Sequence, residues 1–522
     1  MVDSIQNKAF INDKNQFFAH LRLQKDTNAK IIEAEKLANK KDYEFLLKNQ
    51  GNLETEFKLM FAVLKKQKDK NNEAFWSYCY YCATMLETFY KAYSQQAKAE
   101  EYQKLKQQIK DHLLKTEAEE KKKKDEESFI AYLENCFISG FRNIINIPFH
   151  ISAIRDYVAF SNLCRVYWVF CRLTLTNGLL LAKELQLIEA LDAILGTHTN
   201  VDKIISTLQA PNGVLNYFSV GLFLIRFIID TGLLIRHTFF PTEAERKAPA
   251  WERFKYEVKK RHCNNANDLV WALVNFLTNF NHITNIPGPI AGAITAVFLC
   301  FDLSMFIYKR HLAQQDYLAK KAQFLQQIDA YTNSKKFAHL SADERLQHIT
   351  MLNKQLAALE IDWQTKDATF YFACAAATLF VLGFTSALLF SPAGIVVASF
   401  FVCTLGAAMY LSIGTYSKYK ETSLNLQQAE LTEHGLAAAR KEYESARNDF
   451  IFTLVKNTVM PTLLIATFAI CWPAAIALTV AYMGFELFHS YNQHSNRHEV
   501  NKLAAVPEEE SVIDLTPSLA CY

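Results

Sequence analysis

The feature that most constrains this chain is its separation of charge, because long stretches without Asp, Glu, Lys or Arg alternate with densely charged ones. Residues 369–390 and 395–416 each contain twenty-two residues without a charge. A bilayer core of about 30 Å is crossed by about twenty helical residues, so each stretch is long enough to span it. Residues 391–394, which include Pro392 and Gly394, separate the two stretches. The pattern predicts a transmembrane helical hairpin over 369–416.

Two further hairpins are predicted on the same grounds, over 263–308 and 451–490. Residues 290–308 carry Asp302 as their sole charge, and the uncharged run 457–485 contains Pro461 and Pro473. Only 15 Gly and 11 Pro occur in 522 residues, too few for the turns of a large sheet protein. The predicted fold class is all-α, a polytopic membrane protein of transmembrane hairpins with extended cytosolic helices and short coiled-coil segments. Basic residues flank the open ends of the hairpins and are missing from their turns, which predicts cytosolic termini.

The charge pattern divides the chain into eight segments. The predicted order is a polar helical cytosolic region (1–128), apolar and amphipathic helices with a basic loop (129–262), a transmembrane hairpin (263–308), a cytosolic helical hairpin (309–368), a second transmembrane hairpin (369–416), a cytosolic helix (417–450), a third transmembrane hairpin (451–490) and a tail (491–522).

Charged residues inside apolar runs raise the question of a functional intramembrane site. Arg226 and Asp230 lie four residues apart and share one helix face. They either neutralise each other within lipid or a helix bundle, or they belong to a conduction site together with Asp302. The run 158–182 contains Arg165 and Arg172, so a bundle-buried or interfacial helix competes there with a true span.

The polar segments between the hairpins are predicted to be helical. Ser341 and Glu344 have the spacing of a capping box at the start of a helix. Pairing that helix with the one before residues 332–340 gives an antiparallel hairpin. Leu424, Leu431 and Ala438 follow at heptad steps, which is compatible with local packing or with a coiled coil to a partner.

A basic stretch with interleaved aromatic residues lies at 246–261. Trp251, Phe254 and Tyr256 alternate with basic residues, of which Arg253, Lys255, Lys259 and Lys260 are the candidates for lipid contact. Each basic residue close to an anionic bilayer contributes about 1 kcal/mol. The alternative is a loop whose charges only set topology.

No catalytic, metal or cofactor site is predicted, since nucleotide-binding, zinc-protease and hydrolase motifs are missing. Cys79 and Cys82 are read as helix packing, and His489, His494 and His498 as ordinary histidines beside the last hairpin. Fifty-six basic and fifty-three acidic residues balance too closely for a nucleic-acid-binding protein. The polar opening residues predict no secretory signal.

The C-terminal residues carry a glutamate block, Glu508, Glu509 and Glu510, followed by Leu519 fourth from the end. This arrangement resembles the C-terminal signal of effectors of the Dot/Icm type IVB secretion system of Legionella-like intracellular bacteria. The resemblance implies recognition by the secretion machinery, delivery into a host cell and insertion in a host vacuolar membrane. A plain solubilising acidic tail is the alternative.

Two main function hypotheses follow. The first is a translocated effector, embedded in a host membrane as a non-enzymatic anchor, interaction or membrane-remodelling protein, with the lipid bilayer and proteins bound by its cytosolic helices as partners. The second is a transporter or channel with polar groups in the helix bundle. An enzyme with its site in 1–128 is a third and weaker hypothesis.

Overall fold

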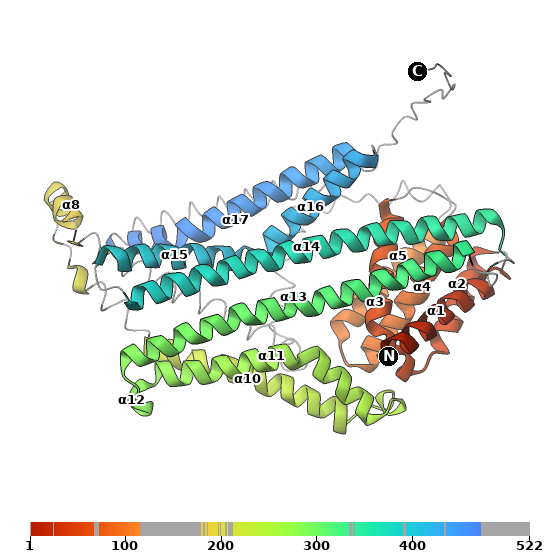
Figure 1. The fold of residues 1–522 in the computed structure, drawn as a ribbon, viewed down its shortest axis with the longest axis horizontal. Helices are drawn as coiled ribbons and strands as arrows, with labels where there is room; N and C mark the ends of the chain where they lie inside the picture. Colours follow the sequence, from red (N-terminus) through yellow and green to blue (C-terminus); the bar gives the residue numbers. More distant parts are fainter. Residues whose placement is uncertain are drawn as a thin grey trace, which may run out of the picture. The chain divides into compact units, whose positions relative to one another are not determined.

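The computed structural model describes residues 2–24, 26–66, 72–114, 186–196, 212–333, 341–389, 393–432 and 435–470, with short pieces between 179 and 206 and at Phe337 and Leu340. Within these residues the chain forms helices and no strand (Figure 1). The helices fall into two compact units, one up to Tyr410 and one from Leu411.

Five helices of the first unit form a helical head. They are α1 (Val2–Leu21), α2 (Thr27–Asn39), α3 (Tyr43–Lys66), α4 (Glu73–Ala92) and α5 (Gln96–Leu114). The Asp26 side chain caps α2 by accepting a hydrogen bond from the Ala29 N–H. Asp42 directly precedes α3, and its side chain accepts from the Phe45 N–H in the first turn of that helix. Helix α4 is buried on almost every side, and Tyr78, Tyr81, Leu86 and Phe89 fill the centre of the head. Cys79 and Cys82 are fully buried there, which confirms that this pair serves packing.

A long antiparallel hairpin is formed by α13 (Gly288–Asn333) and α14 (Ala342–Leu389), which lie side by side in Figure 1. The predicted capping box is confirmed: the Glu344 carboxylate accepts from the Ser341 N–H at 2.9 Å, and the Ser341 hydroxyl accepts from the Glu344 N–H at 3.2 Å. The predicted hairpin over 309–368 is the polar half of this pair. Each helix continues without a break into an apolar half.

A second hairpin in the first unit joins α10 (Asn212–Phe239) to α11 (Ala250–Asn279), with the short 3₁₀ helix η3 (Glu245–Lys247) in the connection. It packs along its length, and α11 also contacts α3 and α13. The first unit further contains α8 (Leu187–Leu195), α12 (Asn281–Thr284) and nearly all of α15 (Ala393–Leu411).

The prediction of transmembrane hairpins is wrong for the part of the chain that the structure describes. None of the helices there combines the length and the apolar character that crossing a bilayer requires. The polytopic fold class and the integral-membrane localisation, including insertion in a host membrane, are corrected on this finding. Residues 471–490 of the third predicted hairpin and most of 158–182 lie outside the described residues.

The physical reason for the correction is that a stretch without charge also serves close packing between helices. Ala376 and Ala408 are fully buried on α14 and α15. An added Cβ at Gly406 would lie 3.1 Å from the Ala376 carbonyl oxygen, so the two backbones approach closely at that point. Small residues make such contacts possible, and charged side chains do not fit them. The sequence pattern showed the lack of charge without showing what the stretch contacts.

The second unit is a helical hairpin of α16 (Ile413–Thr432) and α17 (Leu436–Ile470). Gly435 adopts a φ of +67° directly before α17, a conformation that glycine accommodates without strain. The single helix predicted over 417–450 is therefore interrupted. Of the heptad leucines, Leu424 is buried while Leu431 is 87% exposed, so the heptad is not one continuous packed face.

Candidate functional site

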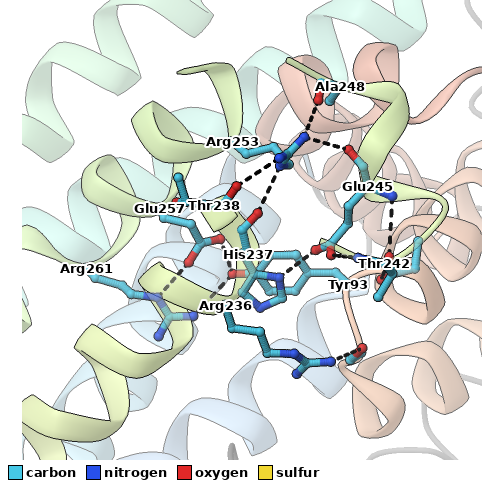
Figure 2. Close-up of polar contacts among 12 residues, drawn as sticks. Tyr93, Arg236, His237, Thr238, Thr242, Glu245, Ala248, Arg253, Glu257 and Arg261 are labelled. Carbon is cyan, nitrogen blue, oxygen red and sulfur yellow. Dashed lines mark hydrogen bonds and ion pairs between the residues drawn. The ribbon is translucent and has the colours of Figure 1, made fainter. Parts of the chain in front are cut away.

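The richest polar cluster among the described residues lies where the α10–α11 hairpin meets the end of α4. Figure 2 shows side chains from the end of α10, the connection with η3 and the start of α11 gathered around Tyr93. Most of these side chains are buried. They decide the shape of the connection between the two helices, because it has little regular secondary structure of its own.

The His237–Glu245 pair anchors this connection. His237 Nδ1 lies 2.5 Å from Glu245 Oε1, and the Thr242 N–H donates to Glu245 Oε2 at 2.8 Å. Burial by itself raises the pKa of Glu245, but the bonds from His237 and Thr242 outweigh it and leave this pKa below its ordinary value. The carboxylate is therefore ionised and holds residues 242–245 against the end of α10.

Arg253 fastens the end of α10 to the same connection. Its guanidinium donates to the carbonyl oxygens of His237 and Thr238 at 2.9 Å each, and to that of Glu245 at 3.1 Å. A further bond reaches the carbonyl of Ala248. Buried carbonyls need such partners once water is excluded. Arg253, which the sequence suggested for lipid contact, is thus a buried structural residue.

A second group of charges lies one turn further along α11. Arg261 donates to Asp230 at 2.7 Å and to Glu257 at 2.8 Å, and the Tyr93 hydroxyl donates to Glu257 at 2.5 Å. All four side chains are buried. The Lys260 ammonium group lies 4.3 Å from the centre of the Tyr93 ring, and loss of water around it lowers the pKa of Lys260 to about 8.

The predicted intramembrane polar residues are not brought together with one another. Asp230 pairs with Arg261, and Arg226 pairs with Asp268 on α11 at 3.1 Å. Asp302 accepts from the Trp271 ring N–H at 2.7 Å, and burial raises its pKa to about 6. Each of the three therefore finds its partner on α11, whereas four-residue spacing pointed to a contact between Arg226 and Asp230.

The buried cluster has the chemistry of a structural support. Arg261 serves both Asp230 and Glu257, and burial keeps a substrate away from His237, Glu245 and Glu257. In the part of the chain that the structure describes, no group of three His, Cys, Asp or Glu side chains could hold a metal ion. A buried hydrogen-bonded network of this kind fixes the position of the surface around it.

That surface carries exposed aromatic residues. Phe239 is 70% exposed, Phe240 72% and Trp251 66%. Arg246 and Lys247 in the connection, and Lys255 and Lys259 on the first turns of α11, are exposed as well. We call these seven residues the tip surface. The sequence pointed to Trp251, Lys255 and Lys259, and it missed Phe239 and Phe240; their signal was a pair of aromatic residues directly before Pro241, where an apolar helix must end.

Comparison with known proteins identifies no relative. No family model, no curated protein and no solved structure matches the chain. The glutamates 508–510, Leu519 and the histidines 489, 494 and 498 lie outside the described residues. The resemblance to secreted effectors stays a prediction.

Proposed function

We propose that the protein is a non-enzymatic docking protein whose tip surface binds anionic lipid headgroups from the aqueous side. The single observation that carries this proposal is the exposure of Phe239, Phe240 and Trp251 among basic residues on a rigidly held helical connection. Large aromatic side chains are normally buried in the protein interior, so three exposed on one helical connection indicate an interaction site. This docking requires no helix that spans the bilayer.

Lipid is favoured as the partner because the tip surface places aromatic side chains at the end of a helical hairpin and carries a net positive charge. Phe239 ends α10, and Trp251 lies in the first turn of α11, so both belong to the end of a hairpin. Aromatic rings of this kind settle at the headgroup level of a bilayer. Exposed acidic residues are few beside the basic ones: Glu243 is exposed and Glu252 half-buried. An anionic surface therefore meets a net positive charge.

The experiment is sedimentation of the full chain with vesicles. Vesicles of phosphatidylcholine with about one-third phosphatidylserine are compared with pure phosphatidylcholine, and we expect binding to the anionic vesicles only. The triple variant Arg246→Gln, Lys247→Gln, Lys255→Gln removes three charges worth about 1 kcal/mol each, so its affinity falls by about a hundredfold. The variant Phe239→Ser, Phe240→Ser, Trp251→Ser loses binding while keeping the charges.

The matched control removes three exposed lysines from the head, Lys40, Lys58 and Lys104, by substitution with Gln. The net charge of the control equals that of the basic triple variant, so its retained binding separates a local surface from overall charge. Equal loss of binding in both variants, or equal binding to neutral vesicles, contradicts the proposal.

A further inference from the structure

Helix α10 carries an exposed apolar stripe on the side opposite to α11. Three residues at heptad steps are buried on its inward side, namely Phe223, Asp230 and His237. Asp230 marks the direction of that side, because it pairs with Arg261 of α11. On the outward side Ile228 is 58% exposed, and Ile225 and Ile235 are 43% exposed each. A contiguous apolar surface of this kind marks an interaction site.

The stripe has the spacing of a coiled-coil seam. Its members follow one another at alternating steps of four and three residues: Gly221, Ile225, Ile228, Gly232, Ile235 and Phe239. This period of 3.5 residues defines the narrow seam by which one helix packs on another. The seam is about 27 Å long at a rise of 1.5 Å per residue. An added Cβ at Gly221 or Gly232 has no described neighbour within 4 Å, so the seam has an open gap at each glycine.

Two copies of the stripe are complementary when they run antiparallel about Asp230. Ile228 of each copy then lies level with Gly232 of the other, and Ile225 lies level with Ile235. A large side chain therefore enters a gap, as in an interdigitating core. In a parallel pair, glycine would face glycine and leave a void, which forfeits dispersion contacts.

The charges of α10 do not oppose pairing of identical copies. Arg226 and Asp230 both find their partners on α11. Arg236 is half-buried and donates to the Ser94 hydroxyl at 3.1 Å. The other residues beside the seam include Leu224 and are uncharged. A two-fold contact therefore brings no like charges together along most of its length, whereas charged flanks would repel their own copy.

The exposed area matches a weak but specific dimer. Leu224, at 42% exposed, adds to the three isoleucines. At about 200 Å² for a fully exposed large side chain, these residues and the half-buried ones between them present about 500 Å² per copy. A pair buries about 1,000 Å², which is the lower limit for a specific interface. A dissociation constant in the micromolar range is therefore expected.

We propose that a second copy of the chain covers this stripe, forming an antiparallel two-fold dimer through α10. Such an interface is isologous, since the same surface serves both copies. Phe239 lies level with Gly221 of the second copy, which has no side chain to cover its ring. Phe240 and Trp251 lie outside the seam, so the dimer leaves the tip surface available and does not depend on its binding lipid.

The test is sedimentation equilibrium of the full chain in lipid-free buffer over about 1–100 µM, where a micromolar dissociation constant is measurable. The average mass is expected to rise from that of one chain towards that of two. A chain that stays monomeric up to about 100 µM overturns the proposal, and so does association that requires added vesicles.

A pair of variants at the facing positions tests the antiparallel register. Gly232→Ile fills the gap that receives Ile228 and is expected to raise the dissociation constant at least about tenfold. Its helix content, measured by circular dichroism, should stay that of the wild type, because the new side chain enters open space in the monomer. The double variant Ile228→Gly, Gly232→Ile exchanges large and small at the same level and should restore dimerisation to within about threefold of the wild type.

The matched control is Ala266→Ile, which adds an isoleucine at an exposed position of α11 outside the seam. Its dissociation constant should equal that of the wild type. Gly232→Ile makes the stripe more apolar, so contact with lipid or unspecific association predicts no loss in that variant. Dimerisation of Gly232→Ile as tight as that of the wild type overturns the proposal.

Discussion

The head and the α10–α11 hairpin differ in how much of their buried interior is charged. The interior of the head is mainly apolar and aromatic, with Tyr78, Leu86 and Phe89 almost without exposure. The hairpin buries Asp230, Glu257, Arg261 and Asp268 between its two helices. Apolar burial tolerates small changes of position, while a buried charge requires its partner at hydrogen-bond distance. The head also buries an ion pair, Lys14 with Glu56, but most of its interior is apolar, whereas charged and polar side chains make up most of the interior at the hairpin's connected end.

The largest effect is expected from removing one charge of the hairpin. Arg261→Met leaves Asp230 and Glu257 buried without their cation, and we expect the free energy of unfolding to fall by about 4 kcal/mol. Denaturation with urea, which unlike guanidinium chloride is not a salt, followed by circular dichroism measures it. The triple variant Asp230→Leu, Glu257→Leu, Arg261→Met removes all three charges and leaves only the Tyr93 hydroxyl without its partners, so it should recover part of this loss. If the triple variant is as unstable as the single one, matched charge is not what the hairpin depends on.

Removing apolar volume from the head should cost somewhat less. Leu86 is fully buried on α4, and Leu86→Ala is expected to lower the free energy of unfolding by about 3 kcal/mol through lost burial and a cavity. The same denaturation experiment applies, at low and at high salt. The loss should be independent of salt in this variant. A loss that changes strongly with salt would remove the distinction between the two interiors.

An intermediate effect is expected where the head meets α14. Burial, with the charges of Lys14 and Arg22, lowers the pKa of His348 to about 4. Because the folded pKa lies below the unfolded one, the contribution of His348 is complete above about pH 6.5 and declines as pH falls toward 4. We expect a loss of about 1–2 kcal/mol between about pH 7 and pH 5, measured by denaturation at each pH. His348→Phe should remove this part of the pH dependence. If the free energy of unfolding of that variant still falls by the same amount between about pH 7 and pH 5, other titrating groups cause the loss.

The smallest effect is expected outside both interiors. Ser341→Ala removes the hydroxyl that accepts from the Glu344 N–H at the start of α14. Loss of such a cap costs about 1 kcal/mol, measured as a shift of the denaturation midpoint. Ser341→Thr, which keeps the hydroxyl as acceptor from the Glu344 N–H and as donor to its carboxylate, serves as the control and should keep the wild-type value. A Ser341→Ala protein as stable as the wild type would show that the Arg22–Glu344 pair alone fixes this helix end.

Local features of the sequence predicted local features of the structure. The sequence was enough to predict the helical character, the capping box of Ser341 and Glu344, and the packing role of Cys79 and Cys82. These features depend on residues within one or two helical turns. The ion-pair partners of charged residues could not be predicted from the sequence. Arg226 has Asp230 at the ideal spacing on its own helix and yet pairs with Asp268, since α11 brings a second set of charges to the same face.

By itself, then, the sequence determined that this chain is helical and where α14 begins, since capping and periodicity act over a few positions. Only the tertiary structure decided what the uncharged stretches contact, which charges are matched and which aromatic residues remain exposed. The physical reason is that burial is a property of neighbours far apart in the chain. Trp251 and Phe254 lie three residues apart in one aromatic and basic stretch, yet the fold leaves the first exposed and half-buries the second.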